Sequence, residues 1–116
     1  MSPIELHATG ASGAKYPLRA YPWGTAFADV PGIYAFLRPT PAGVWQVLYV
    51  GQTQSLGTRV GAGVNGHHRA GEARRRGATH VAVLPWGSGE LARLWVERDL
   101  CAALNPPCNR TLSTSS

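Results

Sequence analysis

The sequence is poor in charge, in cysteine and in long apolar runs. Charged residues make up only 15% of the 116 residues, whereas hydrophobic residues make up 44%. This balance excludes a globally disordered chain, because such chains combine low hydrophobicity with high net charge. The two cysteines, Cys101 and Cys108, are too few for a disulfide framework or a cysteine-based metal cluster. No apolar run approaches the roughly 18 residues that a membrane-spanning helix needs, and the length suits one domain.

Lysine is also scarce, and the basic charge is carried by arginine. There are 11 Lys and Arg residues against 6 Asp and Glu, a formal charge of +5, and Lys15 is the only lysine. A planar guanidinium pairs with phosphate and stacks on bases, so a polyanionic partner is expected. The alternative is a G·C-rich coding sequence that replaces lysine by arginine. The start, MSPIELHATG, has neither a basic segment nor an apolar one, so a reduced, cytoplasmic protein is expected.

Three segments of the chain differ in composition. Residues 1–28 are rich in glycine, proline, alanine and aromatic residues, and predict an irregular N-terminal arm. Residues 29–110 carry the regular patterns and form the predicted domain, and 111–116 predict a flexible tail. The first alternating pattern covers 32–38 and the second 44–51, which predicts an antiparallel hairpin. With a loop of about six residues, Tyr34 would lie opposite Tyr49 on one face of the sheet.

The rest of the domain alternates helical and extended patterns. A short helix around 56–60 and a basic segment at 67–76 precede a strand at 79–86. The best helix, 89–104, ends before the Asn-Pro-Pro sequence at 105–107. The predicted fold class is therefore α/β, a small sandwich with a three-stranded, mostly antiparallel sheet flanked by helices. Its predicted order is β-β-α-α-β-α.

One acidic residue on this last helix is placed unusually. At about 100° per residue, Glu97 falls between two apolar arcs. A carboxylate edged by apolar surface costs free energy unless a metal, an arginine or hydrogen bonds compensate it. The alternative is an exposed i,i+4 salt bridge from Arg93 to Glu97. Helix geometry alone leaves both open.

Five sequence elements occur in an order that resembles a known family. Pro31-Gly32-Ile33-Tyr34 is followed by Leu48-Tyr49-Val50-Gly51-Gln52-Thr53, then by Arg59, Glu97 and Asn109. This order resembles the GIY-YIG nuclease domain and covers 29–109. The second motif here reads YVG, which keeps a β-branched residue at the central position.

The resemblance implies a divalent-metal-dependent endonuclease that hydrolyses phosphodiester bonds in DNA. Glu97 would hold one Mg²⁺ or Mn²⁺ ion, which supplies a Lewis acid. Arg59 would brace the non-bridging phosphate oxygens, and Tyr34 would act as general base or water positioner with Tyr49 beside it. Asn109 would orient the groups near Glu97 through its amide. Taken singly, each of these residues is as well explained by packing or by a solvated surface.

A histidine and four arginines complete the candidate site. Many family members have a His or Tyr four residues after the arginine, where this chain has Gly63. The substitutes are His67 and His68, of which His68 is the candidate, or the helper is absent. The predicted nucleic-acid-binding residues are Arg69, Arg74, Arg75 and Arg76. The alternative is that this run is a solvated face.

The predicted partner is a nucleic acid, DNA rather than RNA, and no membrane is expected. A homodimer or a larger complex is compatible with the sequence. The competing function is a nucleic-acid-binding or interaction module that uses the same surface without cutting. A pure binder has no need of Glu97, so the complete set favours the enzyme.

Overall fold

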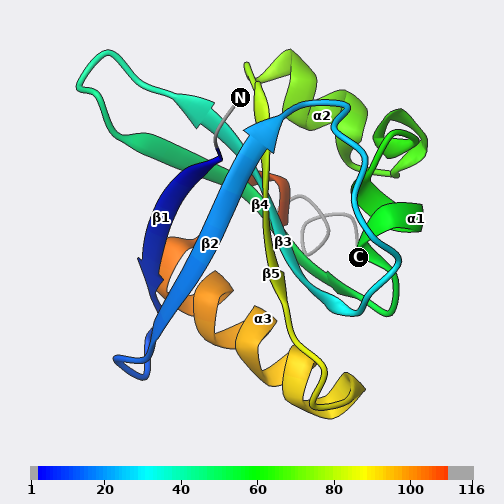
Figure 1. The fold of residues 1–116 in the computed structure, drawn as a ribbon. Helices are drawn as coiled ribbons and strands as arrows, with labels where there is room; N and C mark the ends of the chain where they lie inside the picture. Colours follow the sequence, from blue (N-terminus) through cyan, green and yellow to red (C-terminus); the bar gives the residue numbers. More distant parts are fainter. Residues whose placement is uncertain (1–2, 110–116) are drawn as a thin grey trace.

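The computed structural model describes residues 3–109, and its core is one curved, fully antiparallel sheet. Five strands follow the order β1-β2-β5-β3-β4 (Figure 1). Their bounds are β1 Ile4–Thr9, β2 Lys15–Pro22, β3 Gly32–Pro39, β4 Trp45–Thr53 and β5 His80–Pro85. The hairpin of β3 and β4 therefore joins the N-terminal hairpin through β5, which arrives last in the chain.

The prediction of a three-stranded sheet was wrong, because the sheet has five strands and curls into half a barrel. The two additional strands, β1 and β2, come from the segment that was predicted to be an irregular arm. Strand β2 alternates fully, with Tyr16, Leu18 and Ala20 buried and the residues between them exposed. Pro17 falls at one of the exposed positions, where it lies opposite His7 of β1 and outside the segment that pairs with β5. The predicted tail, 111–116, lies outside the described residues.

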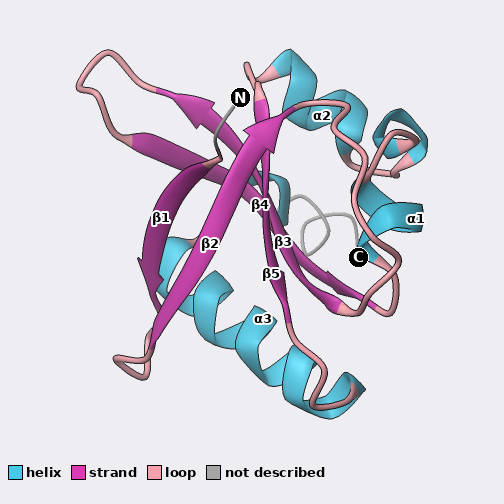
Figure 2. Cartoon of the chain, viewed as in Figure 1, coloured by secondary structure: helices cyan, strands magenta, loops and turns pink. Residues whose placement is uncertain are grey.

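Helices cover both faces of the sheet (Figure 2). They are α1 Leu56–Val60, the 3-10 turn η1 Val64–Gly66, α2 Ala70–Arg75 and α3 Glu90–Leu104. The short helices α1 and α2 pack on one face and the long helix α3 lies on the other (Figure 1). From β3 onward the elements follow the predicted order, and α3 ends at Asn105 in a left-handed conformation. Within the described residues no helix is long and apolar enough to cross a bilayer.

The register of the β3–β4 hairpin differs from the predicted one. Tyr34 lies opposite Gly51 and not opposite Tyr49 for two reasons: next to the loop Arg38 pairs with Gln46, one residue away from the predicted register, and a bulge between Phe36 and Leu37 shifts the pairing by one more residue. The two phenols still share a face, with their ring centroids 6.1 Å apart. Gly51 permits this arrangement, since a Cβ there would overlap the ring and the hydroxyl of Tyr34. The ring of Tyr34 therefore lies directly over the backbone of β4.

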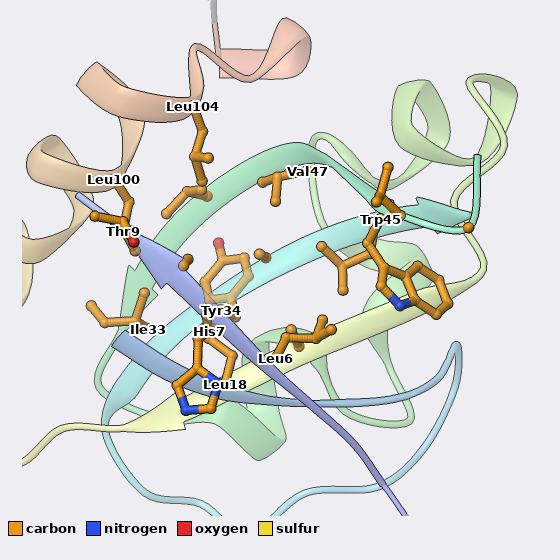
Figure 3. A pocket seen from close by; sticks show the side chains of 17 residues that line it. Leu6, His7, Thr9, Leu18, Ile33, Tyr34, Trp45, Val47, Leu100 and Leu104 are labelled. Carbon is orange, nitrogen blue, oxygen red and sulfur yellow. The ribbon is translucent and has the colours of Figure 1, made fainter. Parts of the chain in front are cut away.

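Curvature brings the two edge strands to opposite sides of one apolar hollow. Leu6 of β1, Val47 of β4 and Leu100 of α3 all line this cavity of about 500 Å³ (Figure 3). Helix α3 fills only part of the concave face, and the cavity is the space left beside it. The edge strands β1 and β4 do not pair with each other, yet Leu6 and Val47 are both partly buried against the same apolar cluster.

A buried carboxylate fastens the N-terminal hairpin to α3. Asp99 accepts hydrogen bonds from the backbone N–H of Ser12 at 2.8 Å, from its hydroxyl at 2.7 Å and from the Tyr16 hydroxyl at 2.8 Å. These donors, first the Ser12 hydroxyl, lower the pKa of Asp99. Because α3 also carries Glu97, this anchor helps to fix the helix that presents the candidate metal ligand.

Candidate functional site

A buried phenol and a buried imidazole form the centre of the candidate site. The hydroxyl of Tyr34, on β3, lies 2.7 Å from Nε2 of His67, which follows η1. The backbone N–H of Arg69 donates to the other ring nitrogen, Nδ1, at 2.9 Å. Nδ1 is therefore an acceptor, so the ring proton of a neutral imidazole must sit on Nε2 and point at the Tyr34 oxygen.

Burial keeps this imidazole neutral. His67 is only 4% exposed. Burial, followed by the charge of Arg59, lowers the pKa of His67 to about 3. At neutral pH the ring therefore acts as a hydrogen-bond donor to Tyr34 and carries no charge.

The two phenols are also neutral in this setting. Tyr34 is 2% exposed, and burial together with the neighbouring Tyr49 raises its pKa far above 10. Hydrogen bonding from Arg59 acts in the opposite direction on the pKa of Tyr34. Burial likewise raises the pKa of Tyr49, with the charge of Glu97 as the next cause, while a hydrogen bond from Tyr34 lowers it. The hydroxyl of Tyr34 thus accepts from His67, and its ring lies beside that of Tyr49.

The accessible side of the cluster consists of Arg59 and His68. Arg59 lies on α1, whose first turn is capped by the Ser55 hydroxyl, which accepts from the Thr58 N–H at 3.3 Å. Nη2 of Arg59 donates to Nδ1 of His68 at 2.8 Å, because a guanidinium has no acceptor. The ring of His68 stacks on that of His67, with centroids 4.6 Å apart. An exposed histidine and a guanidinium therefore lie directly above the buried phenols.

Glu97 approaches the same cluster from the opposite direction, past the outer edge of β4. Its carboxylate is hydrogen-bonded by the backbone N–H of Gln52, and burial raises its pKa despite this bond and the charge of Arg98. The predicted alternative was a salt bridge from Arg93, but Arg93 instead donates from Nε to the side-chain oxygen of Gln52 at 2.9 Å. Within residues 3–109, Glu97 makes no salt-bridge contact with lysine or arginine.

Asn109 occupies the same strand edge. Its side-chain oxygen accepts from the backbone N–H of Val50 at 2.8 Å, and its amide nitrogen donates to the Val50 carbonyl at 2.9 Å. The amide therefore pairs with β4 as another strand would, and it covers backbone groups next to Gln52. The structure thus gathers all five family-like residues around β3 and β4, with Asn109 on the backbone and the other four contributing to one electrostatic network.

The four predicted nucleic-acid-binding arginines lie in and next to α2, and Arg74, Arg75 and Arg76 are exposed. Arg69 and Arg76 both pair with Glu72, at 3.4 and 3.2 Å. Arg74 donates to the Ala78 carbonyl at 2.5 Å and lies over the ring of Trp23 at 5.2 Å. Arg75 is exposed at the end of α2. Three of the four side chains are thus held in place by contacts within the protein.

Gly51 and Gln52 were not named as site residues from the sequence, and of the two substitute histidines His68 was the candidate. His67, and not His68, contacts Tyr34; two adjacent histidines give no sequence signal that tells them apart. Gly51 makes room for Tyr34, and a glycine inside a strand pattern is a signal of close approach that could have indicated it. Gln52 contacts both Arg93 and Glu97, but the contact spans two elements far apart in the chain.

The one protein ligand that the site offers to a divalent cation is the carboxylate of Glu97, among the described residues. Within the described residues no group of three histidine, cysteine or acidic side chains could enclose a metal. Mg²⁺ does not require such a cage, because it keeps several waters and takes phosphate oxygens as ligands. Glu97 meets this requirement as a half-buried carboxylate without an ion-pair partner among residues 3–109.

Comparison with known proteins adds no relative to this geometry. No family model, no curated protein and no solved structure matches the chain. Function is therefore inferred from the arrangement of the residues themselves.

Proposed function

We propose that the protein is a divalent-metal-dependent endonuclease that hydrolyses phosphodiester bonds in DNA. The observation that carries the proposal is the convergence of opposite charges on one phenol pair. The accessible guanidinium of Arg59 lies on one side of Tyr34 and Tyr49, and the field of the Glu97 carboxylate reaches the same two rings. A phosphate oxygen and a hard cation would find complementary partners there.

Glu97 would hold the cation, one Mg²⁺ or Mn²⁺ ion. When bound, the ion supplies a Lewis acid and stabilises charge on the leaving oxygen. Arg59 would bind the non-bridging phosphate oxygens in a fixed orientation, since its Nη2 is already held by His68. Asn109 would keep the edge of β4 straight beside Glu97 by pairing with both backbone groups of Val50.

Tyr34 has two candidate roles, and its setting supports one of them. A general base must lose its proton near the working pH, whereas burial raises the pKa of Tyr34 well above that range. The neutral hydroxyl is instead fixed by His67, and the ring lies beside that of Tyr49. We therefore assign Tyr34 the positioning role, in which it orients Tyr49 and Arg59 toward the attacking water and the phosphate.

The substrate class rests on charge. The chain has a formal charge of +5, and Arg59, His68 and Arg75 all reach the surface on the side of the sheet where α1 and α2 pack. A homodimer, a larger complex and a cytoplasmic location belong to the same proposal as predictions. The competing function, a binding module that does not cut, would use the same basic surface without needing Glu97.

Cleavage assays separate these two functions. Supercoiled plasmid and branched DNA are incubated with the protein, with and without Mg²⁺ or Mn²⁺. Metal-dependent nicking that is lost in Glu97→Gln supports the enzyme. The matched control is Glu90→Gln, because Glu90 lies exposed in the first turn of the same helix. DNA binding with no cleavage under any metal condition would support the binding module instead.

A further inference from the structure

Arg93 and Glu97 lie one helical turn apart on α3 but form no salt bridge with each other. Residues four apart on a helix are neighbours, and opposite charges at this spacing attract. Arg93 is only 4% exposed, so a hydrogen-bond acceptor stabilises its charged guanidinium more than it would stabilise a guanidinium in solvent. The expected partner is the carboxylate of Glu97. The structure places a neutral oxygen, that of Gln52, on Nε of Arg93 at 2.9 Å instead.

Gln52 touches both charged residues with different groups. Its side-chain oxygen accepts from Arg93, and its backbone N–H donates to the carboxylate of Glu97. This double contact follows from its place in β4. Val50, two residues earlier, directs its N–H and carbonyl outward to Asn109, and the outward direction recurs at every second residue of a strand. The backbone of Gln52 therefore points at the edge that Glu97 approaches.

The separation of Arg93 from Glu97 matters for cation binding. When a guanidinium pairs with a carboxylate, it occupies the carboxylate oxygens and neutralises the negative charge. A hard cation needs both the oxygens and the charge, so it binds the paired carboxylate less tightly. If the oxygen of Gln52 were absent, Arg93 would be a buried cation lacking this acceptor. Two carboxylates lie one turn away along its own helix, Glu90 at i−3 and Glu97 at i+4, and of these Glu97 is the half-buried one and Glu90 is exposed.

We propose that Gln52 is a positioning residue that holds Arg93 away from Glu97 and so leaves the carboxylate free to bind a divalent cation. The inference rests on the proposed function, since it assigns the metal to Glu97. It concerns a neutral residue and a buried arginine, neither of which touches the phosphate in the proposed mechanism.

Metal affinity in the absence of nucleic acid tests the inference. Mn²⁺ alone is titrated calorimetrically into the wild type and into Gln52→Met, which keeps the side-chain length but lacks the oxygen. Affinity should fall by about ten- to hundredfold, the range seen when a residue that orients a metal ligand is removed. In Gln52→Met/Arg93→Met the competing guanidinium is gone, and affinity should return to within about threefold of the wild type. Gln52→Glu, which supplies another acceptor for Arg93, should retain affinity.

Two outcomes overturn the inference, and a third concerns the proposed function separately. Wild-type affinity in Gln52→Met would mean that Arg93 does not compete for Glu97. Loss without recovery in the double variant would mean that Gln52 acts through something other than Arg93. If Glu97→Gln binds Mn²⁺ as well as the wild type, the metal site itself is elsewhere.

Urea denaturation of each variant identifies any loss of affinity that comes from unfolding. If Gln52→Met does not fold, Gln52→Glu decides the matter, because it keeps an oxygen in place for Arg93. Retained affinity in Gln52→Glu supports the positioning role of Gln52, and lost affinity in the folded variant overturns it.

Discussion

The neutral, buried state of His67 predicts a specific dependence of stability on pH. Its pKa is about 3 in the folded protein, against 6.5 for an ordinary histidine. Between these values the unfolded chain binds a proton that the folded protein does not, so stability falls as pH is lowered from 6.5 toward 3. At pH 5, about 1.5 pH units below the ordinary value and at about 1.4 kcal/mol per unit, this one group lowers the free energy of unfolding by about 2 kcal/mol.

A comparison of variants isolates this effect from that of the carboxylates. His67→Gln cannot titrate, yet its amide can still donate to Tyr34. Urea denaturation at pH 7 and pH 5 gives the loss of stability for each protein, and the wild type should lose about 2 kcal/mol more than the variant. His68→Gln is the matched control, because the neighbouring ring is exposed and its substitution should change the loss less. Equal losses in the wild type and His67→Gln would refute the assignment of a neutral, buried His67.

Three further substitutions test the site and its surroundings. Tyr34→Phe removes the hydroxyl that links His67, Arg59 and Tyr49 and should lower the single-turnover cleavage rate by about 10² or more; a rate within about threefold of the wild type would assign Tyr34 to packing. Arg75→Ala should flatten the slope of log K against log[salt] for duplex DNA by about 0.9, as expected for one phosphate contact, and an unchanged slope would place the DNA path elsewhere. Gly51→Ala forces a methyl group against the Tyr34 ring and should cost about 1–3 kcal/mol of stability in urea denaturation, whereas Gly63→Ala, whose methyl group meets nothing within 4 Å at an ordinary φ of −91°, should cost less.

Hydrophobic periodicity predicted the elements that carry the site but not the sheet that holds them. The patterns at 32–38, 44–51 and 79–86 are buried strands, and such patterns are visible because nearly every second residue is large and apolar. Strand β1 is mostly exposed and β2 contains Pro17, so both lack the signal that a continuous apolar run provides. Their place in the sheet depends on pairing with β5, which is a tertiary contact.

Hydrophobic periodicity could not predict the register of β3 and β4, nor which of His67 and His68 contacts Tyr34, because both depend on tertiary structure. The loop pairs Arg38 with Gln46, and the bulge at Phe36 and Leu37 adds one more residue of shift, so the partner of Tyr34 is Gly51; no residue type in that segment marks a bulge. The choice between His67 and His68 depends on which ring turns inward beneath Arg59. That direction is set by the chain leaving η1 and by the Arg69 N–H on Nδ1, neither of which the order of residues reveals.

The outer edge of β4 explains how residues so distant in the chain become one site. An edge strand exposes unpaired N–H and carbonyl groups that must find partners. Asn109 satisfies those of Val50, and Glu97 takes the N–H of Gln52, so the same requirement draws α3 and the segment after it to this edge. On its inner side the strand carries Tyr49 beneath Tyr34. Strand β4 therefore has two roles: its edge needs hydrogen-bond partners, and it places the Glu97 carboxylate beside Tyr34 and Tyr49. If α3 were shifted by one turn, the N–H of Gln52 would lose its partner and Glu97 would leave the phenol pair.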